Sequence, residues 1–267
     1  MSAWSTSQVH DAAKLADFLQ THPIRHAYLL GYLDPAYADQ CRWYGAVDGT
    51  GALGAVLLVY TGLARPALFT AGASEPMAAI VRGCRAGLPE SATGHILADH
   101  LDAFLEGYRS NGRLRDMSRM GLDREAYVDR QEDRGADVEV VKLSHRDTGA
   151  ILELYAAWPD HFFEPFQLET GLYFGIRVDG KLVSIAGTHN LSETYDVAGI
   201  GNLVTHPDYR GRSLARYCTA RLLREAFGRI RLISLDVQKG NEPALRTYTH
   251  FGFSHEADFH EGRFLLR

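Results

Sequence analysis

The sequence predicts a mixed α/β protein, of the α+β kind, built as two similar halves in tandem. An apolar strand, an Asp-Gly turn and a second apolar strand occur at residues 43–60 and again at 172–189, which is the pattern of a β-hairpin. Strands and helices alternate through both halves. The segment 127–136 is polar and charged, and we interpret it as a linker between domains at 1–132 and 133–267. Chance recurrence of a common hairpin is the competing interpretation of the repeat.

Hydrophobic spacing places the remaining elements. In the first half we expect a helix, a strand, a helix, a strand and a helix at 8–19, 67–70, 75–87, 94–98 and 101–108. In the second half, outside the hairpin, we expect strands at 138–143, 194–205, 231–237, 253–257 and 263–266, and helices at 147–158, 211–227 and 242–250. The helix at 211–227 is amphipathic, with Leu214, Cys218, Leu222 and Ala226 on one stripe.

Composition argues against several classes of protein. A net charge of −5 over 267 residues gives no general reason to expect binding to nucleic acid or to a membrane. The N-terminus does not resemble a secretory signal, and no apolar run approaches the roughly 18 residues of a membrane span. The three cysteines are far apart and lack metal or redox spacing, so we expect buried thiols in a reducing cytoplasm and no metal site.

A basic turn precedes the long helix. Residues 206–215 read His-Pro-Asp-Tyr-Arg-Gly-Arg-Ser-Leu-Ala, between the strand ending at Thr205 and the helix. Unpaired N–H groups and the positive dipole at a helix N-terminus attract anions, and Arg210 and Arg212 add charge. Seven arginines against one glutamate lie between residues 210 and 231. The segment favours a phosphate-rich ligand, although a solvated basic helix that binds nothing explains it equally well when taken alone.

A second motif occupies residues 241–253. Asn241 stands at a helix start, Ala244 and Tyr248 lie four apart on one face, and Gly252 ends the helix. For this segment alone, a capped helix with a packed tyrosine is the better interpretation.

Taken together, in this order and spacing, the two motifs resemble the closing motifs of the GNAT superfamily of acyl-CoA N-acyltransferases. The resemblance spans about residues 137–267, and the tandem arrangement resembles the subgroup that includes the glycine N-acyltransferase-like proteins. It implies two GNAT-like mixed-sheet domains, of which the N-terminal one is degenerate and the C-terminal one catalytic. It also implies acetyl-CoA or another acyl-CoA as cosubstrate and an amine of a small molecule or peptide as acceptor, with direct attack in a ternary complex.

The resemblance further implies a role for each motif residue. Main-chain groups of the strand would contact the acyl carbonyl and the pantetheine arm, and the amides of residues 212–215 would bind the pyrophosphate. Asn241 would contact the pantetheine or its phosphate end, and Tyr248 would protonate the leaving thiolate. The implied cofactor-binding residues are Leu203, Val204, Thr205, Arg210, Gly211, Arg212, Ser213, Leu214, Ala215, Asn241 and Ala244.

Two departures from the family pattern stand out. Ser213 occupies a position where the family usually has glycine, so a Cβ enters the crowded turn, and we expect modestly weaker binding or altered geometry. The frequent catalytic glutamate on the strand is also missing. The candidates for a general base are Asp196, His189, Glu164 and His161, for each of which an ordinary surface or packing role fits better, and a water relay would make a single base unnecessary. No base signature accompanies Cys218, so we reject it as a nucleophile.

Other functions stay open at this level. A non-catalytic acyl-CoA-binding regulatory protein would explain Ser213 and the missing glutamate. A transferase that uses aminoacyl-tRNA has a related fold but lacks the pyrophosphate loop, and a nucleic-acid binder that uses the arginine helix is disfavoured by the net charge. The N-terminal half either covers the acceptor side or forms a homodimer. The sequence identifies neither the acceptor nor the length of the acyl chain.

Overall fold

The computed structural model describes residues 4–132, 139–156 and 163–267. Contacts between residues divide the chain into two compact units. The first contains Met1–Met120, Asp236–Asn241 and His255–Arg267, and the second contains Gly121–Leu235 and Glu242–Ser254. The expected boundary between residues 132 and 133 falls at the edge of the described ranges. The two units are not simply the first and second halves of the chain, because the C-terminal residues His255–Arg267 belong to the first unit.

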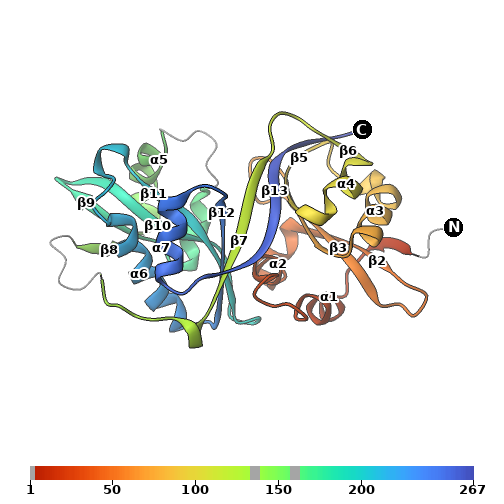
Figure 1. Cartoon of the computed structure of the whole chain (residues 1–267), viewed down its shortest axis with the longest axis horizontal. Helices are drawn as coiled ribbons and strands as arrows, with labels where there is room; N and C mark the ends of the chain where they lie inside the picture. Colours follow the sequence, from red (N-terminus) through yellow and green to blue (C-terminus); the bar gives the residue numbers. More distant parts are fainter. Residues whose placement is uncertain (1–3, 133–138, 157–162) are drawn as a thin grey trace. The chain divides into compact units, whose positions relative to one another are not determined.

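The first unit is a mixed sheet with helices (Figure 1). Its strands follow the order β1-β2-β3-β4-β5-β13, and β6 also pairs with β13. Neighbours are antiparallel except β4 and β5, which are parallel. The elements are β1 (Ser5–Gln8), α1 (Ala12–Leu19), α2 (Ala27–Tyr32), β2 (Cys41–Val47), β3 (Leu53–Tyr60), β4 (Ala67–Gly72), α3 (Ser74–Gly83), β5 (Ser91–Leu97), α4 (Leu101–Leu105), β6 (Tyr108–Ser110), β7 (Arg115–Asp123) and β13 (Ser254–Leu266). The last three residues of β7 and the first residue of β13 are assigned to the second unit.

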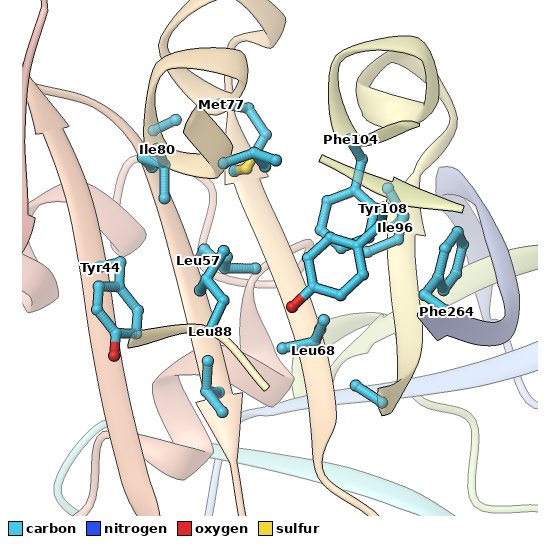
Figure 2. Packing of buried hydrophobic residues seen from close by; sticks show 14 of the residues in the cluster. Tyr44, Leu57, Leu68, Met77, Ile80, Leu88, Ile96, Phe104, Tyr108 and Phe264 are labelled. Atoms are coloured by element: carbon cyan, nitrogen blue, oxygen red, sulfur yellow. The ribbon is translucent and has the colours of Figure 1, made fainter. Parts of the chain in front are cut away.

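A hydrophobic core joins α3 and α4 to this sheet. Figure 2 shows Met77 and Ile80 of α3 above Leu57 and other strand residues. The rings of Phe104 and Tyr108 stack with centroids 4.6 Å apart, and Phe264 meets Phe104 edge-on at 5.2 Å. Because Phe264 comes from β13, the last strand of the chain completes the core of the first unit.

The second unit repeats this plan with a longer central hairpin. Its strands follow the order β12-β11-β10-β9-β8, with only β11 and β12 parallel. Tyr173 packs with residues of α5, whereas the ring of the next residue, Phe174, contacts Arg221 of α6. Because consecutive residues of an extended chain point to opposite faces of a sheet, α5 and α6 cover opposite faces of this sheet. The elements are β8 (Val140–Lys142), α5 (Thr148–Tyr155), β9 (Phe174–Val178), β10 (Lys181–Ser192), β11 (Val197–Thr205), α6 (Leu214–Phe227), β12 (Leu232–Gln238) and α7 (Glu242–His250). The last three residues of β12 are assigned to the first unit.

The order of elements supports the predicted duplication. Both β2-β3-β4-α3-β5-α4 and β9-β10-β11-α6-β12-α7 contain two antiparallel pairings followed by a parallel one. The connections after the third strand differ: Ala73 alone separates β4 from α3, whereas residues 206–213 separate β11 from α6. The mixed α/β fold class is therefore confirmed, and only the second unit has a long loop at this position.

Some predicted elements were wrong in detail. The helix expected at 101–108 ends at Leu105, and Tyr108 begins strand β6, while the helix expected from residue 211 begins at Leu214. Residues 5–8 form strand β1 on the edge of β2, and the helix begins later, at Ala12, where the Asp11 side chain accepts the Lys14 N–H at 3.0 Å. The two expected closing strands are one strand, β13, because β5 supplies partners from Phe259 to Leu265 across the polar middle. Within the described ranges, the structure has no helix with the length and apolar character needed to cross a membrane.

Candidate active site

The central strand of the second unit extends beyond one of its neighbours. β11 and β12 stay in parallel register from Val197↔Leu232 to Ile200↔Leu235. β11 then runs on to Thr205, and over this stretch its register is with β10, where Val204 faces Ile185. The predicted acyl-contact residues, Leu203 to Thr205, therefore lie beyond the last residue of β11 that pairs with β12. In this stretch β11 pairs with β10 on one edge and has no register with β12 on the other.

Two bulges shape this stretch. Between the pairs Ile185↔Val204 and Gly187↔Gly201, β11 has one more residue than β10. Asn202 lies in this bulge with a φ of 54°, a left-handed conformation that asparagine tolerates better than most residues. A second shift places the extra residue on β10, at His189. Bulges re-aim main-chain and side-chain groups, so the middle of β11 is built differently from a regular strand.

A buried network of side chains holds the bulge. The Asn202 side-chain nitrogen lies 2.9 Å from Gln167 Oε1 and 2.8 Å from the Tyr173 hydroxyl, and its oxygen accepts from the Tyr155 hydroxyl at 3.0 Å. Gln167 belongs to a 3-10 helix, η6 (Pro165–Thr170), and its Nε2 contacts His189 Nδ1 at 3.4 Å. Gln167 and both tyrosines are buried. The network connects β11 to α5 and η6 on one face of the sheet.

The loop after β11 is arranged around two left-handed residues. Pro207–Tyr209 form a short 3-10 helix, and Gly211 and Ser213 have φ values of 76° and 59°. Ser213 is the N-cap residue of α6, but its side chain makes no capping hydrogen bond. The amides of the first turn of a helix have no partner within the helix, so this exposed turn offers N–H donors to a ligand.

Charge at the loop is concentrated on its exposed arginines. Arg210 and Arg212 are exposed; Arg210 Nε lies 3.4 Å from the Thr205 carbonyl oxygen, and the Arg212 guanidinium stacks 5.1 Å from the Tyr209 ring centroid. The other five arginines of this region, Arg216, Arg221, Arg224, Arg229 and Arg231, form ion pairs with carboxylates. Carboxylates thus compensate much of the positive charge of the basic helix, which weakens the interpretation as a nucleic-acid binder.

Tyr248 lies on α7. Its side chain is 7% exposed, its ring meets Phe253 edge-on at 5.9 Å, and burial raises its pKa to about 12. The hydroxyl is therefore protonated at neutral pH, as a proton donor must be. Ala244 lies in the first turns of α7, and exposed Asn241 precedes that helix with its N–H donating to Gln238. Asn241 belongs to a segment of the first unit, whereas the other predicted site residues lie in the second.

The candidates for a general base occupy different settings. Asp196 is exposed at the start of β11 and accepts the Arg231 N–H at 2.7 Å, which fastens the strand to its neighbour at the end opposite the loop. Glu164 begins η6 and donates its N–H to Gln167. His189 contacts Gln167 in the buried network, while His161 lies outside the described residues. Cys218 is buried, and burial raises its pKa to about 12, in keeping with its rejection as a nucleophile.

The residues that the sequence did not single out are Tyr155, Gln167, Tyr173 and Asn202. Asn202 is the only polar side chain between Val197 and Val204, and an asparagine after a glycine inside an apolar strand is a signal of a bulge. Its partners carry no comparable signal, because packing and hydrogen bonding explain an isolated buried tyrosine or glutamine equally well. Among the described residues, no group of three or more histidine, cysteine or acidic side chains is arranged to hold a metal ion.

The comparisons with known proteins agree with this geometry. Residues 140–253 match the model of the acetyltransferase (GNAT) family. This stretch contains β11, the loop and α6, and the second half of the chain is therefore a GNAT acetyltransferase domain. No curated protein sequence matches the chain significantly.

Solved structures extend the likeness in fold to the whole chain. A Drosophila protein superposes with a TM-score of 0.72 at 15% identity, covering 100% of this chain and 99% of that one. A GCN5-related N-acetyltransferase from Kribbella flavida gives 0.62 at 18% identity, with coverages of 94% and 95%. A tandem GNAT protein from the clavulanic acid biosynthesis pathway gives 0.57 at 14% identity, with coverages of 98% and 97%. The family match over residues 140–253 confirms the predicted resemblance to the GNAT superfamily for this domain, and the solved structures add a likeness in fold over the whole chain.

Proposed function

We propose that this protein transfers an acyl group, with acetyl the first choice, from acyl-CoA to the amine of a small molecule or peptide. Two adjoining features carry the proposal. The end of β11 continues beyond its pairing with β12, and the loop that follows leads to an N-terminus of α6 that has no side-chain cap and is flanked by arginines. A diphosphate fits the amides of residues 212–215 through charge and hydrogen bonding. Main-chain groups of Leu203, Val204 and Thr205 then hold the acyl carbonyl and the pantetheine arm.

The reaction is direct aminolysis within a ternary complex. The neutral amine attacks the thioester carbon, the C–N bond forms, and the C–S bond breaks as the oxyanion collapses. Tyr248 gives its proton to the departing CoA thiolate, the amine loses its proton to water, and water returns a proton to Tyr248. Asn241 keeps the pantetheine contact that the motif assigns to it, and no covalent enzyme intermediate or metal is needed. Positioning of the two substrates supplies much of the rate.

The proposal includes a division of labour and a cellular setting. The catalytic domain is the C-terminal one, and the N-terminal domain lacks the loop because Ala73 alone connects β4 to α3. In that unit the last β4–β5 pair is Phe69↔His95, and just beyond it the Thr70 hydroxyl accepts the Leu97 N–H at 3.0 Å. A side chain of β4 therefore bonds to β5 at the position where, in the second unit, β11 continues beyond its pairing with β12. We propose homodimer formation as a role for the N-terminal domain, and we assign the protein to the cytoplasm.

Calorimetry with acetyl-CoA and a thiol-release assay against a panel of amines test the function. We expect binding of acetyl-CoA, and release of CoA that depends on an amine. Arg210→Ala combined with Arg212→Ala should weaken binding roughly tenfold or more, in line with the loss of two charge-assisted contacts. The matched control, Arg42→Ala at the exposed position of β2 in the first unit, should bind normally. Absence of any acyl-CoA binding would refute the proposal.

The same assay separates the competing function, a non-catalytic acyl-CoA-binding regulator. β11 carries no acidic residue, which is the observation that favours this competitor. Binding with no turnover across the amine panel would support the regulator and contradict the transferase.

A further inference from the structure

The described part of the predicted linker lies along α6. The rings of Tyr127 and Phe227 meet with centroids 4.8 Å apart at the C-terminal end of that helix. Two residues further on, the Asp129 carboxylate accepts from Arg224 Nε at 3.0 Å and from a terminal nitrogen of the same guanidinium at 3.1 Å. As the segment 127–132 proceeds, its contacts move toward the start of α6, so the two run in opposite directions.

Glu132 continues this series at the other end of α6. Its Oε2 forms an ion pair with Arg216 Nε at 2.6 Å, and Arg216 lies in the first turn of the helix. From Arg216 to Phe227 the helix rises by about 17 Å, and an extended chain from Tyr127 to Glu132 spans about the same length. A nearly extended segment therefore reaches from one end of α6 to the other.

The other oxygen of the Glu132 carboxylate contacts α7. His250 Nε2 and Glu132 Oε1 are within hydrogen-bond distance, and because an ionised carboxylate can only accept, Nε2 carries the proton. The Glu132 side chain is only 14% exposed, so solvent and salt screen this bridge less than an open surface pair. One carboxylate thus joins Arg216 in the first turn of α6 to the last residue of α7.

α7 has little buried surface of its own. Of its nine residues, all of which the structure describes, only Tyr248 is buried. An element with few buried contacts opens or shifts more easily than one anchored in a core. His250 is two residues from Tyr248, about 3 Å along the helix axis, so a displacement of the end of α7 also displaces Tyr248.

We propose that Glu132 is a positioning residue, which holds α7, and with it Tyr248, in place relative to the first turn of α6. This inference rests on the proposed function, which assigns the diphosphate to that turn and the proton donor to Tyr248. A donor must lie within hydrogen-bond reach of the departing sulfur. Because a misplacement of about 1 Å can cost roughly a hundredfold in rate, the bridge controls the chemical step.

Hydrogen exchange tests the bridge without any activity. Glu132→Ala removes both contacts, so we expect the main-chain amides of α7 to exchange at least about tenfold faster than in the wild type. The matched control is Asp129→Ala, which breaks the neighbouring ion pair with Arg224 of α6, and its α7 amides should exchange at the wild-type rate. Equal exchange of α7 in the wild type and in Glu132→Ala would overturn the proposal.

Kinetics separate positioning from a purely structural role. At a temperature where Glu132→Ala stays folded, kcat should fall about tenfold or more, while the dissociation constant of acetyl-CoA changes less than about threefold, because the amides of α6 are retained. Asp129→Ala should keep the wild-type kcat. Unchanged kcat in Glu132→Ala would overturn the proposal.

Substitutions of His250 test the same bridge from its other end, and they decide the matter if Glu132→Ala fails to fold. His250→Ala should lose as much kcat as Glu132→Ala, and the double variant should lose no more than either one. His250→Gln keeps an N–H donor for the carboxylate and should stay near the wild type. Equal losses in the Gln and Ala variants, or losses that multiply in the double variant, would contradict the bridge.

Failure of this inference differs from failure of the proposed function. If the wild type acylates amines and both Glu132→Ala and His250→Ala are as active, the positioning role is refuted and the transferase stands. If the wild type binds no acyl-CoA, the proposed function fails and the positioning role fails with it.

Discussion

The side-chain nitrogen of Asn202 donates to the side-chain oxygen Oε1 of Gln167 at 2.9 Å, although 35 residues separate them in the sequence. This bond ties the bulge of β11 to η6. Asn202 also makes hydrogen bonds with Tyr155 and Tyr173, so one amide connects three other segments of the second unit. The strand that we assign to the thioester is thus held in an irregular shape by side chains, and this shape should be sensitive to their removal.

Asn202 should therefore be critical for stability. Asn202→Ala removes hydrogen bonds that contribute about 1 kcal/mol each and also forces alanine into a left-handed conformation, so we expect a loss of about 3–4 kcal/mol. Asn202→Gly removes the same bonds but adopts the φ of 54° readily, and should lose about 1 kcal/mol less. Urea unfolding measures both. Equal stabilities of the two variants would show that the backbone at this position is not strained.

Sequence reasoning found the local parts of this protein and missed those that depend on distant partners. The Asp-Gly hairpins, the loop at 206–213 and α6 follow from turn chemistry and helical spacing, which are encoded within a few residues. The Asn202–Gln167 contact has no local signal. The continuous strand β13 was likewise hidden, because its polar middle is extended only through its pairing with β5.

Ser213 should weaken the binding of acyl-CoA. It has a φ of 59° at the N-cap of α6, where glycine avoids the Cβ clash, so Ser213→Gly should relieve about 1 kcal/mol of strain and tighten acetyl-CoA binding several-fold. Calorimetry and thermal unfolding measure the two effects. Asp179→Gly is the matched control, with a φ of 50° in the β9–β10 turn, and should change stability without changing affinity. Weaker binding by Ser213→Gly would indicate that the hydroxyl contacts the ligand.

Tyr248 should matter for the chemical step and not for binding. Tyr248→Phe keeps the packing against Phe253 but removes the proton donor, so we expect kcat to fall by about 10²-fold while the dissociation constant of acetyl-CoA stays the same. Burial raises the pKa of Tyr248 to about 12, so the wild type should show no loss of activity from its ionisation below about pH 10. Unchanged kcat in the variant would remove Tyr248 from the mechanism.

Acid should destabilise the first unit through His26. This histidine is 4% exposed, its Nδ1 lies 2.9 Å from the Leu19 carbonyl oxygen, and burial lowers its pKa to about 4 from 6.5. Between these two values the unfolded chain binds the proton and the folded chain does not, so stability should fall as the pH drops from 6.5 to 4, by at most about 3 kcal/mol from this group. Burial shifts the pKa of His95 and His100 in the same direction.

A pair of substitutions isolates the contribution of His26. His26→Asn places an amide N–H near the Leu19 oxygen and cannot titrate, so its stability should depend less steeply on pH between 6.5 and 4 than that of the wild type. His10→Asn, at an exposed position, should leave the pH dependence as it is. Denaturant unfolding at several pH values measures the slopes. If the wild type and His26→Asn have the same slope, His26 is already protonated in the folded state or exchanges with solvent, and the buried neutral imidazole is refuted.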